Sequence, residues 1–244
     1  MRKIWAIIIS AACMFMSSCY HEDQPFQGEY DDVFIYYMMG YNDLNSYLKS
    51  DLEELCSGIL PGKHREKAIV AFCHTPKSSN DYKSVNPPVL IRIAREEGKA
   101  VLDTVKVYDE IKISVTPECL NTVLGDIREL LPSKSYGILF SSHATGWVPE
   151  QYAGGSLPMS ASSNAQHQTY PMTKSIGSFF NGGKHDIREM YIMEFAGAFP
   201  MKMDYIIFDA CLMGGIEVAW ELKDVCDHIV FSPTEILAQG MIYN

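Results

Sequence analysis

The stretch YIIFDACLMGGIEVAWELKD, residues 205–224, decides the fold. A short apolar run reaches Cys211, two glycines follow, and a helical pattern then begins. This order predicts that Cys211 ends a buried strand, where a reactive side chain can be exposed at a sheet edge. The stretch YGILFSSHATGW, residues 136–147, has the same design with His143 at its end. A thiol and an imidazole at two strand ends indicate a cysteine nucleophile with a histidine base.

Apolar runs alternate with helical patterns along the rest of the chain. The apolar runs predict buried strands at residues 33–39, 68–73, 136–141, 205–209 and 228–232. Helical periodicity predicts helices at residues 43–55, 116–131, 186–199 and 215–225. A β-hairpin is expected over residues 87–108, turning at 97–99, and residues 149–184 are the longest irregular stretch.

This alternation predicts an α/β fold, a mainly parallel sheet with helices on both faces and a small β-hairpin. Right-handed crossovers bring the carboxyl ends of parallel strands to one edge, where functional sites form in such sheets. The first helix is expected to be capped by Asn42 or Asp43. Its apolar stripe is predicted to consist of Leu44, Tyr47, Leu48, Leu52 and Leu55.

The composition is that of a globular protein with an acidic surface. The 244 residues are 47% hydrophobic and carry a formal net charge of −10. No basic cluster is present, and this argues against nucleic-acid binding, which needs concentrated Lys and Arg. We expect a signal segment at residues 1–18, a tether at 19–30 and one domain at 31–244.

The N-terminus, MRKIWAIIISAACMFMSSC, has the pattern of a targeting segment. Arg2 and Lys3 form a positive region, and the apolar run that follows is too short to span a bilayer. Residues 16–19 resemble a bacterial lipobox, so we expect cleavage before Cys19 and acylation of its thiol. The protein would then be anchored in the cell envelope of a bacterium. The alternative is an ordinary signal peptide in which Cys19 is incidental.

The remaining cysteines carry no pattern of a disulfide scaffold or a zinc site. They are odd in number and contain no CxxC pair. Apart from Cys211, they are interpreted as small buried apolar residues: Cys56, Cys73, Cys119 and Cys226. No metal site is predicted from the sequence.

Residues around Cys211 can support attack on a carbonyl carbon. A nearby histidine or helix N-terminus lowers the pKa of a thiol, and Cys211 has candidates for both. The backbone N–H groups of Cys211 and of the residue after His143 are candidate donors to an oxyanion. Asp209 would point to the same side as Cys211 if the strand continued, and its carboxylate could bind a substrate Arg or Lys. Alternatively, Asp209 only accepts backbone hydrogen bonds at the strand end.

Four sequence blocks resemble the clostripain family of cysteine peptidases, relatives of gingipains, legumains, separases and caspases. The most specific block is YIIFDACLMGGIEVAWELKD, which resembles the family's cysteine block. The supporting blocks are YNDLNSYLKSDLEEL, GILFSSHATGW and IVFSPTEILAQGMIY. The resemblance runs from about residue 31 to the end of the chain.

The resemblance implies a caspase-like three-layer α/β fold and endopeptidase activity after Arg or Lys. It implies that Cys211 is the nucleophile and His143 its partner, with the backbone of Ala144 and Cys211 as the oxyanion hole. It also favours Asp209 as the base of the S1 pocket, which holds the residue before the cleaved bond. No cofactor is required, although some family members respond to calcium.

Two departures from the family pattern motivate a rival interpretation. Ala144 replaces a glycine that usually follows the histidine, and a methyl group there could crowd the oxyanion hole. The chain also stops at Asn244, where the family's sheet normally continues, so a C-terminal part is expected to be missing. The rival is a non-catalytic envelope lipoprotein that uses the fold as a binding module. Family members are often matured by cleavage between the two blocks, where Lys174 and Lys184 are candidates.

Overall fold

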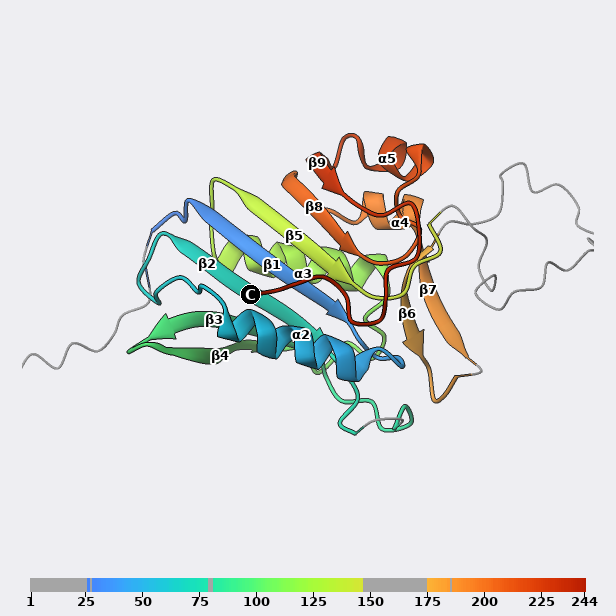
Figure 1. Cartoon of the computed structure of the whole chain (residues 1–244), viewed down its shortest axis with the longest axis horizontal. Helices are drawn as coiled ribbons and strands as arrows, with labels where there is room; N and C mark the ends of the chain where they lie inside the picture. The colour runs from blue at the N-terminus through green and yellow to red at the C-terminus, as the bar shows by residue number, and fades with distance from the viewer. Residues whose placement is uncertain (1–25, 27, 79–80, 147–174, 185) are drawn as a thin grey trace, which may run out of the picture.

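A computed structural model describes residue 26 and residues 28–78, 81–146, 175–184 and 186–244 (Figure 1). The described residues form a seven-stranded sheet in the order β4-β3-β2-β1-β5-β8-β9 and a two-stranded sheet, β6-β7. The strands are β1 Asp32–Met39, β2 Lys67–His74, β3 Val89–Glu96, β4 Lys99–Val107, β5 Tyr136–Ser141, β6 Ser175–Phe180, β7 Ile187–Tyr191, β8 Met203–Asp209 and β9 Cys226–Val230. The helices are α2 Asn45–Ser57, α3 Pro117–Leu130, α4 Ile192–Gly197 and α5 Ile216–Leu222.

The centre of the large sheet is parallel, as the sequence predicted. β1 pairs in parallel with β2 and β5, β5 with β8, and β8 with β9. The register pairs Ser141, the last residue of β5, with Asp209, the last residue of β8. The segments that follow these two strands therefore leave the sheet side by side at one edge. β3 and β4 form the predicted antiparallel hairpin, which lies at the end of the strand order opposite to β9.

Helices cover both faces of the sheet and complete the three layers (Figure 1). Neighbouring strand residues point to opposite faces, so Tyr36 and Tyr37 of β1 belong to different cores. The core containing Tyr36 is covered by α2 and by the C-terminal segment, residues 231–244. The core containing Tyr37 is covered by α3, α4 and α5. The predicted α/β architecture with helices on both faces is confirmed.

One predicted helix is wrong in its first half. Residues 186–199 were expected to be helical, but β7 occupies Ile187–Tyr191 and the helix α4 covers only Ile192–Gly197. β7 pairs with β6, which lies within the stretch expected to be irregular. Every residue of β6 is buried. Pairing with a buried strand thus overrides the local helical pattern of residues 187–191.

The described part of the chain begins in contact with the sheet. Tyr30, the last residue of the expected tether, is buried, and its backbone N–H donates to the carbonyl of Pro132 over 2.8 Å. The signal segment, Cys13 and the lipobox with Cys19 lie outside the described residues. Among the residues that are described, no helix is both long and apolar enough to cross a membrane.

Candidate active site

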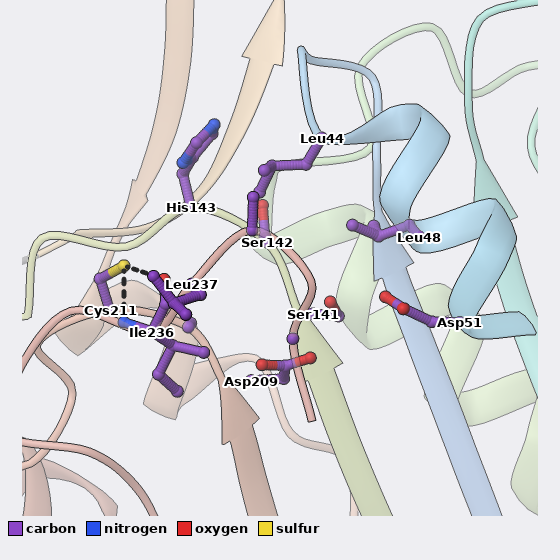
Figure 2. Close-up of a pocket in the computed structure, with 13 residues that line it drawn as sticks. Leu44, Leu48, Asp51, Ser141, Ser142, His143, Asp209, Cys211, Ile236 and Leu237 are labelled. Carbon is purple, nitrogen blue, oxygen red and sulfur yellow. Dashed lines mark hydrogen bonds between the residues drawn. The ribbon is translucent and has the colours of Figure 1, made fainter. Parts of the chain in front are cut away.

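A cavity of about 120 Å³ opens at the sheet edge where β5 and β8 end. By the same kind of measure one water molecule needs roughly 10–15 Å³, so the cavity has room for a side chain. It is lined by the segments that follow both strands, by α2, and by residues of the C-terminal segment (Figure 2). The structure thus places three of the predicted site residues in one cavity: His143, Asp209 and Cys211.

The loops that carry His143 and Cys211 are in direct contact. Gly146 has a φ of 55°, a left-handed conformation that favours glycine. A β-carbon at this position would lie 1.9 Å from the carbonyl oxygen of Leu212. The N–H of Ser142 also donates to the carbonyl of Asp209 over 3.4 Å. Glycine at 146 is therefore needed for the two loops to meet.

Cys211 is partly buried just beyond the end of β8. The N–H of Ile236 donates to its sulfur over 3.4 Å, and the thiol lies 3.5 Å from the carbonyl of the same residue. The next residue, Leu212, has a φ of 61°, which is unusual for a residue with a branched side chain. Strained backbone of this kind gathers at functional sites because the surrounding structure must hold it in place.

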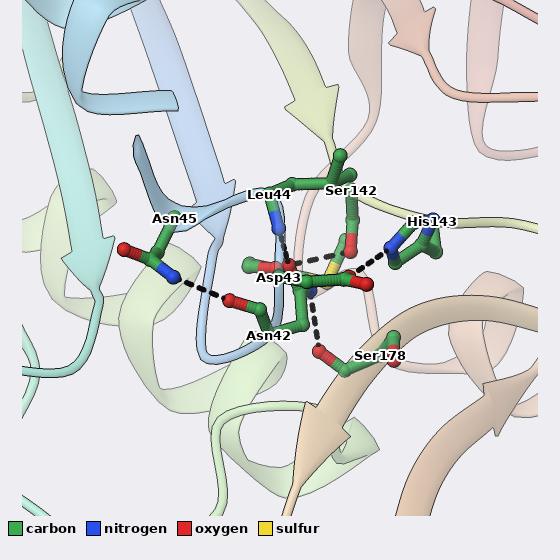
Figure 3. A network of polar contacts seen from close by, with 8 residues as sticks. Asn42, Asp43, Leu44, Asn45, Ser142, His143 and Ser178 are labelled. Carbon is green, nitrogen blue, oxygen red and sulfur yellow. Dashed lines mark hydrogen bonds and ion pairs between the residues drawn. The ribbon is translucent and has the colours of Figure 1, made fainter. Parts of the chain in front are cut away.

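His143 is paired with an aspartate that the sequence reasoning had assigned another role. Its Nε2 lies 2.8 Å from Oδ1 of Asp43, and the two side chains are 42% and 47% exposed (Figure 3). Asp43 had been considered, with Asn42, as the cap of the first helix. The helix instead begins at Asn45 after Leu44, with no side-chain cap.

Asn42 holds the loop that presents Asp43 to the imidazole. It is buried, and its side-chain nitrogen donates to the carbonyls of Met39 and Ser178 over 2.9 and 2.8 Å. Its side-chain oxygen accepts the N–H of Leu44. The loop between β1 and α2 is therefore fixed to β1 and to β6, and this leaves the Asp43 carboxylate free to face His143.

The imidazole and the thiol share the cavity without a direct hydrogen bond between them in the described structure. Among the described residues, the imidazole makes its polar contact with Asp43 and the thiol makes its polar contacts with Ile236. Catalytic hydrogen bonds are often long in free enzymes and tighten only when substrate binds. The arrangement is therefore compatible with proton transfer between Cys211 and His143 across the bound substrate.

Asp209 lies at the inner end of the cavity and is only 5% exposed. Its Oδ2 accepts the hydroxyl of Tyr243 over 2.5 Å and the N–H of Met241 over 3.2 Å. In the described part of the chain, no group donates a hydrogen bond to Oδ1 of Asp209. Both interpretations of Asp209 thus have support, since it accepts protein hydrogen bonds and also lines the cavity.

The predicted oxyanion donors lie in loops that β6 and the C-terminal segment hold in place. The residues flanking Ala144 bond to β6: the N–H of Thr145 donates to Ser175, and the carbonyl of His143 accepts from Gly177. The loop hydrogen bonds of the described chain use the N–H of neither Ala144 nor Cys211. The methyl group of Ala144 packs against the apolar core. The methyl group of Ala144 is therefore accommodated against the core and not in the predicted oxyanion hole.

The other described cysteines are less suited to act as nucleophiles. Burial raises the pKa of Cys73 to about 12 and the pKa values of Cys119 and Cys226 to about 11. It also raises the pKa of Cys56. A thiol with a raised pKa provides little thiolate near neutral pH. None of these four thiols lines the cavity, whereas Cys211 does.

The described residues provide no candidate calcium or zinc site. No three of their His, Cys, Asp or Glu side chains gather closely enough to hold a metal ion. Of the two candidate maturation sites, Lys174 lies outside the described residues. Lys184 is exposed in the turn between β6 and β7.

Comparison with known proteins agrees with this geometry. The model of the clostripain family of peptidases matches residues 36–244 of the chain. The chain therefore belongs to the clostripain family, which is a family of cysteine peptidases. No curated protein matches the sequence significantly.

Solved structures with the same fold are bacterial cysteine proteases of this family. A secreted protease from Bacteroides thetaiotaomicron, in complex with an irreversible peptide inhibitor, is 24% identical with a TM-score of 0.67. A structure of a secreted protease from the same organism, called iotapain, is 25% identical with a TM-score of 0.66. An inactive zymogen from Parabacteroides distasonis is 23% identical with a TM-score of 0.65.

The similarity extends over most of this chain but only about half of each solved chain. The three alignments cover 88%, 89% and 89% of this chain and 52%, 56% and 53% of the respective solved chains. These likenesses support the caspase-like α/β fold predicted from the sequence.

Proposed function

We propose that this chain carries the site of a cysteine endopeptidase that cleaves peptide bonds after Arg or Lys. One observation carries the proposal: Cys211, His143 and Asp209 line a single cavity at the carboxyl edge of the sheet. Membership of the clostripain family supports the class of chemistry. The substrate preference is argued from Asp209.

Cys211 and His143 act as nucleophile and base. The imidazole accepts the thiol proton, and the sulfur attacks the carbonyl carbon of the scissile bond. The C–N bond breaks as His143 returns the proton to the leaving amine, and this leaves a thioester on Cys211. Water then attacks the thioester with His143 again as base, and the acid product leaves with the thiol restored.

The oxyanion that forms on the carbonyl is stabilised by backbone donors. The N–H groups of Ala144 and Cys211 follow the ends of β5 and β8, and neither donates in a loop hydrogen bond of the described chain. Donors that need no reorganisation stabilise developing charge most effectively. The contact of Gly146 with Leu212 supports this arrangement, because it fixes the two loops against each other.

Asp43 positions the histidine. It holds Nε2 of His143 at 2.8 Å, and Asn42 in turn holds its loop. A carboxylate in this position orients the ring and stabilises the imidazolium that forms after the thiol proton is transferred.

Asp209 selects a basic residue at P1, the substrate residue before the scissile bond. Its carboxylate is buried at the inner end of the cavity, where an ion pair is weakly screened by solvent. The described residues that line the cavity include no Lys or Arg that would neutralise this charge. A cationic side chain entering from the substrate would therefore supply the missing counter-ion.

Mapping the cleavage products of a denatured protein substrate tests the proposal. We expect new C-termini at Arg and Lys, and no such products from the Cys211→Ala or His143→Ala protein. Cleavage by a folded Cys211→Ala protein would overturn the assignment of the nucleophile. Absence of all cleavage and of active-site labelling in the folded wild-type chain would favour the non-catalytic binding module.

We also propose that the protein is held at the bacterial envelope by acylation of Cys19. Support comes from the lipobox-like residues 16–19 and from relatives described as secreted bacterial proteases. Cells fed labelled palmitate should incorporate label into the wild type and not into the Cys19→Ala protein. Equal labelling of the two proteins would contradict the anchor.

A further inference from the structure

Asp51 of α2 is a buried carboxyl group on the wall of the same cavity. The inward face of α2 consists of Asn45, Leu48, Asp51 and Leu55. Asp51 is 5% exposed, and Figure 2 shows its side chain extending from α2 toward Ser141, with Asp209 on the other side of the cavity. A carboxyl group thus occupies a position on this helix where an apolar side chain would normally pack against the core.

The Asp51 carboxyl has no hydrogen-bond or ion-pair partner in the described structure. Asp209, by contrast, accepts two hydrogen bonds on Oδ2. Neither oxygen of Asp51 is among the fully buried polar atoms that lack a partner, so both remain accessible from the cavity. A purely structural residue at this position would be expected to have a donor.

The groups around Asp51 are acidic or hydroxyl groups. Glu54 lies on the same helix, Asp209 ends β8, and the hydroxyl group of Tyr36 comes from β1. The Tyr36 hydroxyl oxygen is itself buried without a partner. Burial, followed by repulsion from Asp209 and Glu54, raises the pKa of Asp51 to about 7. Among the described residues that line the cavity, no Lys or Arg faces these carboxyl groups.

We propose that Asp51 is the second acidic residue of the P1 pocket and binds the cationic end of a P1 Arg or Lys together with Asp209. This inference rests on the proposed function, because it assigns the specificity of the same site. The two carboxyl groups come from different elements and line the same small cavity.

The donors of a basic side chain match the acceptors that remain. Tyr243 and Met241 already occupy Oδ2 of Asp209, which leaves Oδ1 for the substrate. A guanidinium has five N–H donors and an ammonium has three. Asp209 alone would leave most of these donors unsatisfied in a buried pocket. The two oxygens of Asp51 add two acceptors to Oδ1 of Asp209, and these three match the donors of an ammonium and most of those of a guanidinium.

Substrate binding would displace a proton from Asp51. Near and below pH 7 the free pocket holds Asp51 partly or fully protonated, and a bound cation favours the ionised form. The preference for basic over neutral P1 residues should therefore rise as pH increases through about 7. Comparing basic with neutral substrates cancels the pH dependence of the chemical step, which both substrates share.

The test compares Asp51→Asn with Glu53→Gln, a matched change of an exposed carboxylate on the same helix. Peptides with Arg, Lys or norleucine at P1 are assayed at pH values below and above 7. We expect Asp51→Asn to lower kcat/KM for Arg and Lys relative to norleucine by about 10- to 100-fold, mainly through KM. The rise of this ratio with pH should disappear. Glu53→Gln should retain both the ratio and its pH dependence.

Binding without catalysis separates this inference from the proposed function. Aminobenzamidine, an amidine that resembles a guanidinium, is titrated into the Cys211→Ala protein and into the Cys211→Ala, Asp51→Asn double variant. Weaker binding to the folded double variant, by about tenfold or more, supports Asp51 even if the wild type cleaves nothing. Equal binding, or an unchanged Arg-to-norleucine ratio in Asp51→Asn, overturns the role of Asp51 and leaves cleavage by Cys211 untouched.

Discussion

The two halves of the cavity differ in how far they are buried. In the catalytic half, the side chain of His143 is 42% exposed, and that of Asp43, which contacts His143 from outside the cavity lining, is 47% exposed. In the acidic half, Asp209 and Asp51 are each 5% exposed. Under the proposed function, the reacting groups must reach a peptide backbone and a water molecule, and this agrees with their place at the opening. Groups that recognise a charge act most strongly away from water, where the local dielectric constant is low.

The halves also differ in the segments that build them. The catalytic half is made from residues directly after β5 and β8 and from the loop after β1. The acidic half adds the inner face of α2. The C-terminal segment contacts both halves, because Ile236 bonds Cys211, and Met241 and Tyr243 bond Asp209. Substitutions in one half should therefore alter turnover, and substitutions in the other should alter the choice of substrate.

The largest expected effect is in the catalytic half. Replacing the nucleophile, Cys211→Ala, should lower kcat roughly 10⁴-fold or more for every substrate, whatever its P1 residue. Cys56→Ala provides the control, since that thiol is outside the cavity and burial raises its pKa. Steady-state cleavage of matched Arg and norleucine peptides measures both. A loss of kcat that is confined to the Arg peptide would contradict the division of the cavity into a catalytic half and an acidic half.

The next effect belongs to the acidic half. Asp209→Asn should lower kcat/KM for Arg and Lys peptides roughly 10²- to 10³-fold, because it removes a buried partner of the substrate charge. The norleucine peptide should lose much less. If all three peptides lost the same factor, Asp209 would have a structural role at the strand end and would not select the substrate.

A smaller effect is expected from the residue that positions the histidine. Asp43→Ala should lower kcat roughly 10- to 100-fold at a nearly unchanged KM, because the imidazole loses its fixed orientation. Asp43→Asn keeps an acceptor oxygen and should recover part of the loss. A rise in KM with an unchanged kcat would instead place Asp43 in the acidic half.

The smallest effect concerns stability and follows from the pKa of Asp51. The folded protein holds a proton on Asp51 up to about pH 7, whereas the unfolded chain releases it near the usual pKa of 3.8. The unfolded state therefore binds fewer protons in this window, and the free energy of unfolding falls as pH rises through it. In the Asp51→Asn variant, this decrease in the free energy of unfolding should be absent.

Melting temperatures of the wild type and Asp51→Asn at several pH values measure this effect. The variant should match the wild type near pH 4 and exceed it above about pH 7. The difference should be roughly 2–4 °C for each kcal/mol that ionisation costs the wild type. Glu53→Gln should show no such pH-dependent gain. A variant that melts lower than the wild type above pH 7 would mean that the ionised carboxylate stabilises the fold.

The sequence predicted the catalytic half better than the acidic half. Buried apolar runs ending at Cys211 and His143 specify parallel strand ends, and such ends meet at one edge of a sheet. Their meeting could therefore be inferred without coordinates. The contact between Asp43 and His143 was not predicted, because helix caps and histidine partners use the same residue types and only the folded loop distinguishes them.

Asp51 was missed because the inner face of α2 was assigned from its leucines. The four leucines of the predicted stripe pack against the core and Tyr47 is exposed, but the buried face also contains Asn45 and Asp51. Periodicity alone cannot place a helix whose inward face carries polar residues. A carboxylate amid the apolar positions of a helix beside a predicted site is the signal that could have found it.

The error at residues 186–199 has a similar origin. The local pattern is helical, but β7 forms because β6 offers a partner strand. The turn residues Gly182 and Gly183, set between two apolar runs, were the available signal for a hairpin. Which strands pair depends on the whole fold, so a local sequence pattern is a weak guide to strand pairing.

Covalent labelling with an arginyl chloromethylketone tests the joint action of the two halves most directly. The site of the adduct and the labelling rate are measured by mass spectrometry on the folded chain. We expect one adduct, on Cys211, that is lost in His143→Ala, slowed in Asp209→Asn, and formed much more slowly by the norleucyl reagent. An adduct on another cysteine, or labelling of Cys211 at the same rate by both reagents, would contradict a shared site of nucleophile and acidic pocket.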